Sequence, residues 1–209
     1  MVQIINKCGY GEQLHRRLRT FSGKNSKNKY FITPKDERMH NCSVVTLGIG
    51  RNVEAEIQFK RTFPHCSFTG ADPVADRNEE LYRQLGAFHQ VAVGSDADEA
   101  PTRLLTDIGY EYRNVNTIPM SYFMLKYIPS STGDDLFMNL EGAEYKILNV
   151  FLRNGELALN GFVVCQWNLE LHNPSEHEKL LAHQFFTANA EDGGFVPLIA
   201  STNGGSHRL

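Results

Sequence analysis

Short apolar runs alternate with amphipathic stretches from residue 42 onward. The predicted strands in the first half are residues 43–47, 67–71 and 88–93. The predicted helices between them are residues 53–63 and 74–85, whose apolar positions recur at helical spacing. A repeated order of strand, helix and strand predicts parallel pairing with right-handed crossovers.

The second half continues this alternation after an interruption. Residues 94–115 show neither period and contain Pro101 and Gly109, so we expect irregular structure there. Two further strands are predicted at residues 135–140 and 161–167, each followed by a helix. Ser175 and Glu178 form a capping box that predicts the start of the last helix. The fold class is therefore predicted to be α/β, with a Rossmann-like, mostly parallel sheet flanked by helices.

The first forty residues lack this alternation. We expect residues 1–40 to form a helical N-terminal arm in front of an α/β domain of residues 41–209. Leu14, Leu18 and Phe21 recur at the spacing of a short amphipathic helix. The basic residues beside them, with no acid between, are Arg16, Arg17, Arg19, Lys24, Lys27 and Lys29. They form either a solvated face or a patch that docks an acidic partner or lipid headgroups.

The composition narrows the classes of function. The 209 residues are 41% hydrophobic and 22% charged, with a formal net charge of −3. This balance creates no field that favours nucleic acid or an anionic membrane, so we expect neither as a partner. No apolar run approaches the ~20 residues of a membrane span. No apolar leader is visible, which makes a cytoplasmic location the default expectation and a lumenal one the alternative if residues precede Met1.

Four cysteines are present and none forms a Cys-x-x-Cys pair, so we predict no metal site. Cys165 lies within an apolar run and is predicted to be a buried strand thiol. Cys8, Cys42 and Cys66 can pair in an oxidising compartment, and the sequence leaves the connectivity open. Residues 41–43 match the Asn-x-Ser glycosylation pattern, a weak indication of a lumenal address.

Glycines and polar residues follow the first three predicted strands, where parallel sheets form ligand crevices. Gly48 and Gly50 come after the first strand and permit either close approach to a ligand or a plain tight turn. Asp72 follows the second strand, where it either binds the ribose hydroxyls of a nucleoside or caps the next helix. Ser95 and Asp96 follow the third strand and either reach a purine ring or form an ordinary acidic turn.

The later strand exits carry acids and a histidine. Asn139, Glu141 and Glu144 surround the end of the fourth strand, where they can hold a substrate hydroxyl, a cofactor amine or a metal. The alternative for Glu144 is an acid favoured in a first helical turn by the helix dipole. Glu170 and His172 follow the fifth strand on one face. Such a pair can accept a proton from a substrate hydroxyl, and the alternative is a surface histidine without a role.

These motifs resemble those of the FkbM-type family of class I, S-adenosylmethionine-dependent methyltransferases, of which the chain looks like a divergent member. Residues 139–148 closely resemble the family hallmark, Asp-x-Glu-Gly-Ala-Glu followed by an apolar helix. The other motifs follow in a similar order. They are the glycine loop (residues 48–51) after the first strand, an acidic residue before Pro73, residues 92–96 and a Glu-x-His motif. The similarity covers roughly residues 42–202.

The resemblance implies S-adenosylmethionine as the cofactor and methyl transfer to a hydroxyl of a small-molecule or glycan acceptor. The implied cofactor positions are Thr46, Gly48, Gly50, Asp72, Ser95, Asp96 and Asn139. The residues expected on the acceptor side are Glu141, Glu170 and His172.

Two positions depart from the family pattern. Thr46 stands where the family has an acid, and Asn139 stands where it has Asp. An amide cannot act as a base or carry charge, although it still forms hydrogen bonds. The alternative function is therefore a catalytically degenerate methyltransferase-like protein that binds a partner. A nicotinamide-type oxidoreductase is a third hypothesis, which the incomplete glycine pattern disfavours.

The family normally completes its sheet with a final antiparallel strand. The sequence ends at Leu209, where such a strand would begin. An incomplete C-terminal strand pair, with an open sheet edge, is therefore left open by the sequence.

Overall fold

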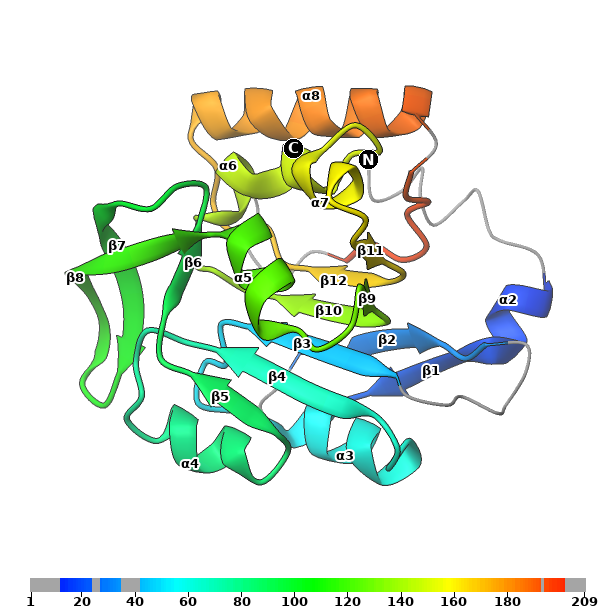
Figure 1. The fold of residues 1–209 in the computed structure, drawn as a ribbon, viewed down its shortest axis with the longest axis horizontal. Helices are drawn as coiled ribbons and strands as arrows, with labels where there is room; N and C mark the ends of the chain where they lie inside the picture. The colour runs from blue at the N-terminus through cyan, green and yellow to red at the C-terminus, as the bar shows by residue number, and fades with distance from the viewer. Residues whose placement is uncertain (1–11, 24–26, 35–41, 193, 202–209) are drawn as a thin grey trace.

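Five parallel strands form the centre of the computed structural model, which describes residues 12–23, 27–34, 42–192 and 194–201. They are β3 (Ser43–Leu47), β4 (Ser67–Ala71), β5 (Ala87–His89), β10 (Asp135–Met138) and β12 (Trp167–Leu169). Their order in the sheet is β12-β10-β3-β4-β5 (Figure 1). The predicted α/β class with a mostly parallel sheet is confirmed. Strand addition reverses beside β3, so the switch point lies between β3 and β10.

Apolar side chains cover both faces of the sheet. Every residue of β3 is buried, which is why this strand reads as a nearly continuous apolar run. Because side chains alternate along a strand, Val45 and Leu136 pack into one core while Val44 and Phe137 pack into the other.

Helices cover the two faces (Figure 1). One face carries α3 (Glu54–Thr62) and α4 (Asn78–Arg83). The other carries α5 (Met120–Tyr127), α6 (Glu144–Ile147), the 3-10 turn η1 (Leu148–Phe151), α7 (Glu156–Leu159) and α8 (Glu176–Asp192). Ser175 N donates to Glu178 Oε2 at 2.7 Å and Glu178 N donates to Ser175 Oγ at 3.3 Å, which confirms the capping box. Within the described ranges, no helix is both long and apolar enough to cross a membrane.

The N-terminal segment differs from the predicted helical arm. Its elements are α2 (Glu12–Arg17), β1 (Leu18–Phe21) and β2 (Lys29–Ile32), and the two strands pair antiparallel. The helical prediction is wrong from Leu18 onward. Extended backbone lets Phe21 and Phe31 enter the core beside Phe59, with ring centroids 4.9 and 4.8 Å from that ring.

Strand β2 is also tied to the residues around the edge strand β12. Tyr30 N donates to Asn168 Oδ1 and Ile32 N donates to Gln166 Oε1, both at 2.7 Å. The hairpin therefore shares a core and hydrogen bonds with the main sheet, while the domain division at residue 40 stays a prediction. Residues 194–201 adopt no strand, and the question of a final strand beyond them lies outside the described residues.

A second hairpin occupies the segment that was expected to be irregular. It consists of β7 (Glu99–Thr106) and β8 (Gly109–Pro119), and the end of β8 pairs with β6 (Ala92–Gly94). The expectation of irregular structure is wrong because no residue of β8 is buried, so burial imposes no apolar alternation on its sequence. Gly109 adopts a φ of +108° directly after the tip, which a residue with a side chain rarely does.

The apolar run at residues 162–165 is less buried than predicted. Phe162 is buried, but Val163 is 54% exposed and Cys165 is exposed, so the prediction of a buried strand thiol is wrong. The reason is that β11 (Val163–Val164) pairs with β9 (Thr132–Gly133) in a separate two-stranded sheet outside the main one.

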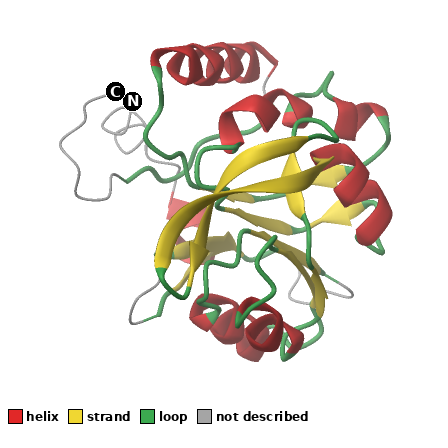
Figure 2. Cartoon of the chain, turned by 90° about the vertical axis from the view of Figure 1, so that its left-hand side faces the viewer, coloured by secondary structure: helices red, strands yellow, loops and turns green. Residues whose placement is uncertain are grey.

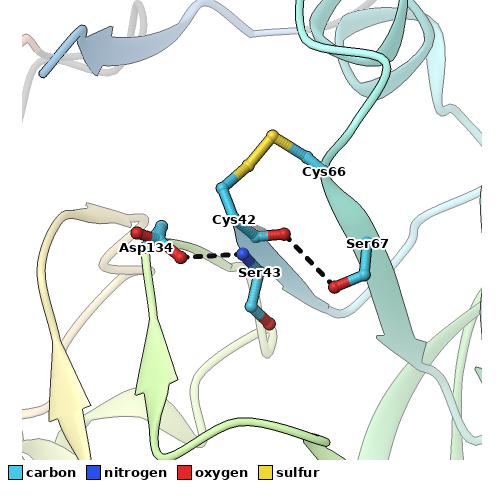
Figure 3. The surroundings of a disulfide bond; sticks show 5 residues. All are labelled: Cys42, Ser43, Cys66, Ser67 and Asp134. Atoms are coloured by element: carbon cyan, nitrogen blue, oxygen red, sulfur yellow. Dashed lines mark hydrogen bonds between the residues drawn. A yellow bond between two sulfur atoms is a disulfide. The ribbon is translucent and has the colours of Figure 1, made fainter. Parts of the chain in front are cut away.

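A disulfide joins Cys42 to Cys66 at the starts of β3 and β4 (Figure 3). The Cα atoms are 4.5 Å apart, and Ser67 Oγ donates to the Cys42 carbonyl at 3.2 Å beside the bridge. Cys8 lies outside the described residues. His65 offers a ring nitrogen within 4.8 Å of both sulfur atoms, but the bridge engages both thiols.

Candidate active site

The carboxyl ends of the central strands are joined by backbone hydrogen bonds. Gly48 N donates to the Ala71 carbonyl at 2.9 Å, and Asn139 N donates to the Leu47 carbonyl at 2.9 Å. Gly48 has a φ of +77°, and a Cβ at this position would lie 1.7 Å from the Asn139 carbonyl oxygen. Only glycine therefore permits both the turn and the close approach of the two exits that flank the switch point.

Asp72 holds the glycine loop in place. Its Oδ2 accepts hydrogen bonds from Ile49 N at 2.9 Å and Gly50 N at 3.4 Å, and its Oδ1 accepts from Val74 N at 2.9 Å. Burial raises the pKa of Asp72, and the three backbone donors oppose that rise. Asp72 does not cap α4, because α4 begins only at Asn78. The predicted ribose contact stays a prediction.

Two positions at this edge have room or hydrogen-bonding capacity that the described residues do not use. Gly50 has a φ of +61°, and a Cβ there would meet no atom within 4 Å. The Asn139 Oδ1 atom is buried and has no hydrogen-bond partner among the described residues. A buried carbonyl oxygen without a donor is costly, so its position beside the glycine loop favours a ligand that donates to it.

Thr46 does not lie with these residues. Its side chain is buried on the α3 face, where Oγ1 lies 3.4 Å from Glu56 Oε1. Lys29 from β2 forms an ion pair with Glu56 and lies 4.3 Å above the Phe137 ring. A carboxylate therefore does lie near Thr46, but it comes from α3 and is neutralised by a lysine.

Ser95 and Asp96 follow β6, which pairs with β8 rather than with the central sheet. Asp96 is exposed, and its carbonyl accepts a hydrogen bond from Thr117 Oγ1 at 2.7 Å. The structure thus ties this segment to the hairpin, and the predicted contact with a purine ring stays a prediction.

The turn after β10 is shaped by Glu144. Glu141 and Gly142 have φ values of +54° and +115°. Glu144 is fully buried and accepts from Leu140 N at 2.7 Å through Oε1 and from Gly142 N at 2.8 Å through Oε2. These two bonds fix the backbone on both sides of Glu141 and so hold the turn that carries it.

His172 lies between two carboxylates. Its Nδ1 is 2.8 Å from Glu144 Oε1 and its Nε2 is 3.8 Å from Glu141 Oε1. Burial alone would lower the pKa of His172, but the hydrogen bond and charge of Glu144, together with the charge of Glu141, raise it despite the opposing charge of Lys27. Tyr145 OH donates to the His172 carbonyl and fixes the backbone.

Glu170 has a different partner from the one expected. Its carboxylate forms an ion pair with Lys27, from the loop between β1 and β2. The predicted acid–imidazole pair is therefore formed by His172 with Glu141 and Glu144, while Glu170 lies at the rim with the N-terminal hairpin.

The β7–β8 hairpin lies across this edge, where Figure 2 shows its long strands in front of the sheet. Arg103 Nη1 donates to Glu141 Oε2 at 2.7 Å, and Tyr110 OH donates to Glu141 Oε1 at 3.1 Å. At the tip, Asp107 pairs with Arg51 of the glycine loop. No sequence pattern pointed to these residues, because their positions depend on a hairpin that the sequence analysis did not predict.

A parallel sheet with helices on both faces and a glycine loop beside an acidic turn is consistent with an α/β protein of the methyltransferase-like type. The family profile of the methyltransferase FkbM domain matches residues 14–197. The chain therefore belongs to the FkbM methyltransferase family, and the expected family is confirmed. Searches of curated proteins and of solved structures found no match.

Proposed function

We propose that the protein transfers a methyl group from S-adenosylmethionine to a hydroxyl of a small-molecule or glycan acceptor. The observation that carries the proposal is His172, held between Glu141 and Glu144 at the sheet edge that also bears the glycine loop. Family membership supports methyl transfer, and the local geometry supports a hydroxyl as the group that loses a proton.

The residues at the edge fit an adenosyl cofactor. The open space at Gly50 would accommodate the cofactor beside Gly48 and Asp72. The unpartnered amide oxygen of Asn139 would accept a hydrogen bond from it. When bound, S-adenosylmethionine supplies a methyl carbon that takes the electron pair of the acceptor oxygen while the carbon–sulfur pair stays on sulfur. Alignment of acceptor and donor then accounts for much of the rate.

His172 is the proposed general base. Its neutral form can accept the hydroxyl proton on Nε2, and Glu141 beside that nitrogen stabilises the imidazolium that results. Arg103 and Tyr110 hold Glu141 against the exit of β10. Glu170 and Lys27 would contact the acceptor further out at the rim.

A matched pair of glycine substitutions tests the cofactor site. Gly50 and Gly161 both have positive φ, at +61° and +73°, and neither would place a Cβ within 4 Å of another atom. Gly50→Ala and Gly161→Ala therefore impose similar backbone strain, but only Gly50 lies at the proposed site. We expect Gly50→Ala to weaken S-adenosylmethionine binding at least about tenfold, which is about 1.4 kcal/mol, and Gly161→Ala to leave it unchanged. Equal effects would contradict the assignment.

Asn139 also supports the alternative of a degenerate, non-catalytic member that binds a partner. Asn139→Asp discriminates between the two. A gain of cofactor affinity or activity in this variant would favour a decayed enzyme, whereas tight cofactor binding by the parent protein would count against the binding-only function.

A further inference from the structure

We propose that Glu144 is a positioning residue that keeps one proton of His172 on Nδ1, so that Nε2 presents its lone pair to the acceptor. The assignment of the ring proton stands on the geometry alone. Its consequence for catalysis rests on the proposed function, in which Nε2 accepts the proton of the acceptor hydroxyl.

The hydrogen bonds of Glu144 define which atom must donate. Its carboxylate is fully buried and already accepts from two backbone N–H groups, Leu140 N and Gly142 N. Both oxygens thus already accept, and the carboxylate form of a glutamate has acceptor sites only. The ring nitrogen 2.8 Å from Oε1 is therefore Nδ1–H.

The groups around the other ring nitrogen are consistent with this assignment. Glu141 faces Nε2 at 3.8 Å from the turn after β10, and Lys27 reaches the region from the N-terminal hairpin. The oxygens of Glu141 accept hydrogen bonds from Arg103 and Tyr110, so each oxygen has a donor without an N–H group at Nε2. Tyr145 fixes the backbone of His172 and further limits rotation of the residue.

Glu144 was open to a simpler explanation from the sequence, an acid favoured by the helix dipole. That role needs neither complete burial nor a histidine partner. The observed contacts give the residue two linked tasks: it closes the turn that presents Glu141, and it orients the ring that Glu141 faces. The same arrangement, a buried carboxylate on the far nitrogen of a histidine base, sets the tautomer in acid–base catalysis.

Nitrogen-15 NMR of the imidazole in the parent protein tests the assignment directly. Above the pKa of His172, we expect protonated Nδ1 and unprotonated Nε2. A neutral ring with its proton on Nε2 would overturn the proposal, and this reading needs no variant.

Glu144→Gln then removes the charge with little change in shape. We expect the pKa of His172 to fall by about one pH unit or more, and kcat to fall by about 10²-fold with little change in cofactor affinity. Glu156→Gln, an exposed acid in the first turn of α7, is the matched control and should change neither quantity. An unchanged His172 pKa in Glu144→Gln would overturn the positioning role.

His172→Asn separates this proposal from the proposed function. Asparagine can still donate to Glu144 but cannot act as a base. If His172→Asn retains full methyl transfer while the parent shows the Nδ1–H form, the base role fails and the positioning of the ring stands. If the tautomer is the opposite one, the positioning fails whatever the activity.

Discussion

Arg103 donates to Glu141 at 2.7 Å across 38 residues of sequence, and this bond joins the β7–β8 hairpin to the exit of β10. Arg103 also lies 3.8 Å above the Tyr110 ring, whose hydroxyl reaches the same carboxylate. The hairpin thus contacts the proposed acceptor side of the site, and through Arg51 and Asp107 it contacts the glycine loop as well. The position of the hairpin is therefore linked to the arrangement of Glu141 and of the glycine loop.

Arg103→Met should loosen this hairpin with little loss of overall stability. The ion pair is partly exposed, with 35% of the Arg103 side chain accessible, so we expect a cost below about 1 kcal/mol. Hydrogen exchange across residues 99–119 should become faster. Arg113→Met is the control, because Arg113 pairs with Glu111 inside the same strand. Equal exchange in the two variants would contradict the coupling.

The stability of the protein should depend on pH through His172. Burial opposes the rise in its pKa, but Glu144 and Glu141 prevail, so the folded protein holds the proton more tightly than the unfolded chain. The resulting stabilisation is fully present below the unfolded value of about 6.5 and is lost as the pH rises through the folded pKa.

Urea unfolding of the parent and of His172→Asn measures this effect. The difference in unfolding free energy should be largest below about pH 6.5 and should shrink as the pH rises above that value. His183→Asn, on the exposed face of α8, controls for loss of a histidine as such. A difference between parent and His172→Asn that stays constant with pH would contradict the assigned environment.

Lys29→Met should destabilise the protein strongly. Glu56 is only 1% exposed, and removal of its lysine leaves an uncompensated buried charge, at a cost of about 3 kcal/mol. The double variant Lys29→Met with Glu56→Met should recover most of that loss. Lys27→Met, which removes a lysine with a 49% exposed side chain, should cost much less in a urea titration. Equal losses for the two lysines would contradict the buried ion pair between Lys29 and Glu56.

Reduction of the Cys42–Cys66 bridge should also lower stability. The bridge spans a sequence separation of 24, for which loop entropy gives about 3.5 kcal/mol. Unfolding of Cys66→Ser, compared with Cys165→Ser at the exposed free cysteine, measures the effect. If both variants match the parent under oxidising conditions, the bridge does not form in solution.

The central strands and their exits were predictable because burial on both faces imposes a strong pattern. Ser43–Leu47 is mostly apolar and is followed by Gly48, which the turn requires, so its place was clear from sequence alone. The pairing of His172 with an acid was also expected at this edge. The prediction named Glu170, whereas the contacts are with Glu141 and Glu144, because the turn after β10 brings α6 toward β12.

The two hairpins that the sequence analysis did not predict share a physical cause. Arg103 and Tyr110 lie on a hairpin whose long strand β8 has no buried residue, so burial leaves no apolar alternation to detect. Leu14, Leu18 and Phe21 recur at helical spacing, but the core around Phe59 holds Phe21 in extended backbone. Tertiary contacts, rather than local preference, determine both hairpins.

Calorimetric titration of the parent protein with S-adenosylhomocysteine tests the central claim most directly, that the edge formed by Gly48, Asp72 and Asn139 binds an adenosyl group. We expect a single site with heat that is lost or strongly reduced in Gly50→Ala and retained in Gly161→Ala. Absence of heat at high micromolar ligand, with the parent protein folded, would contradict the account.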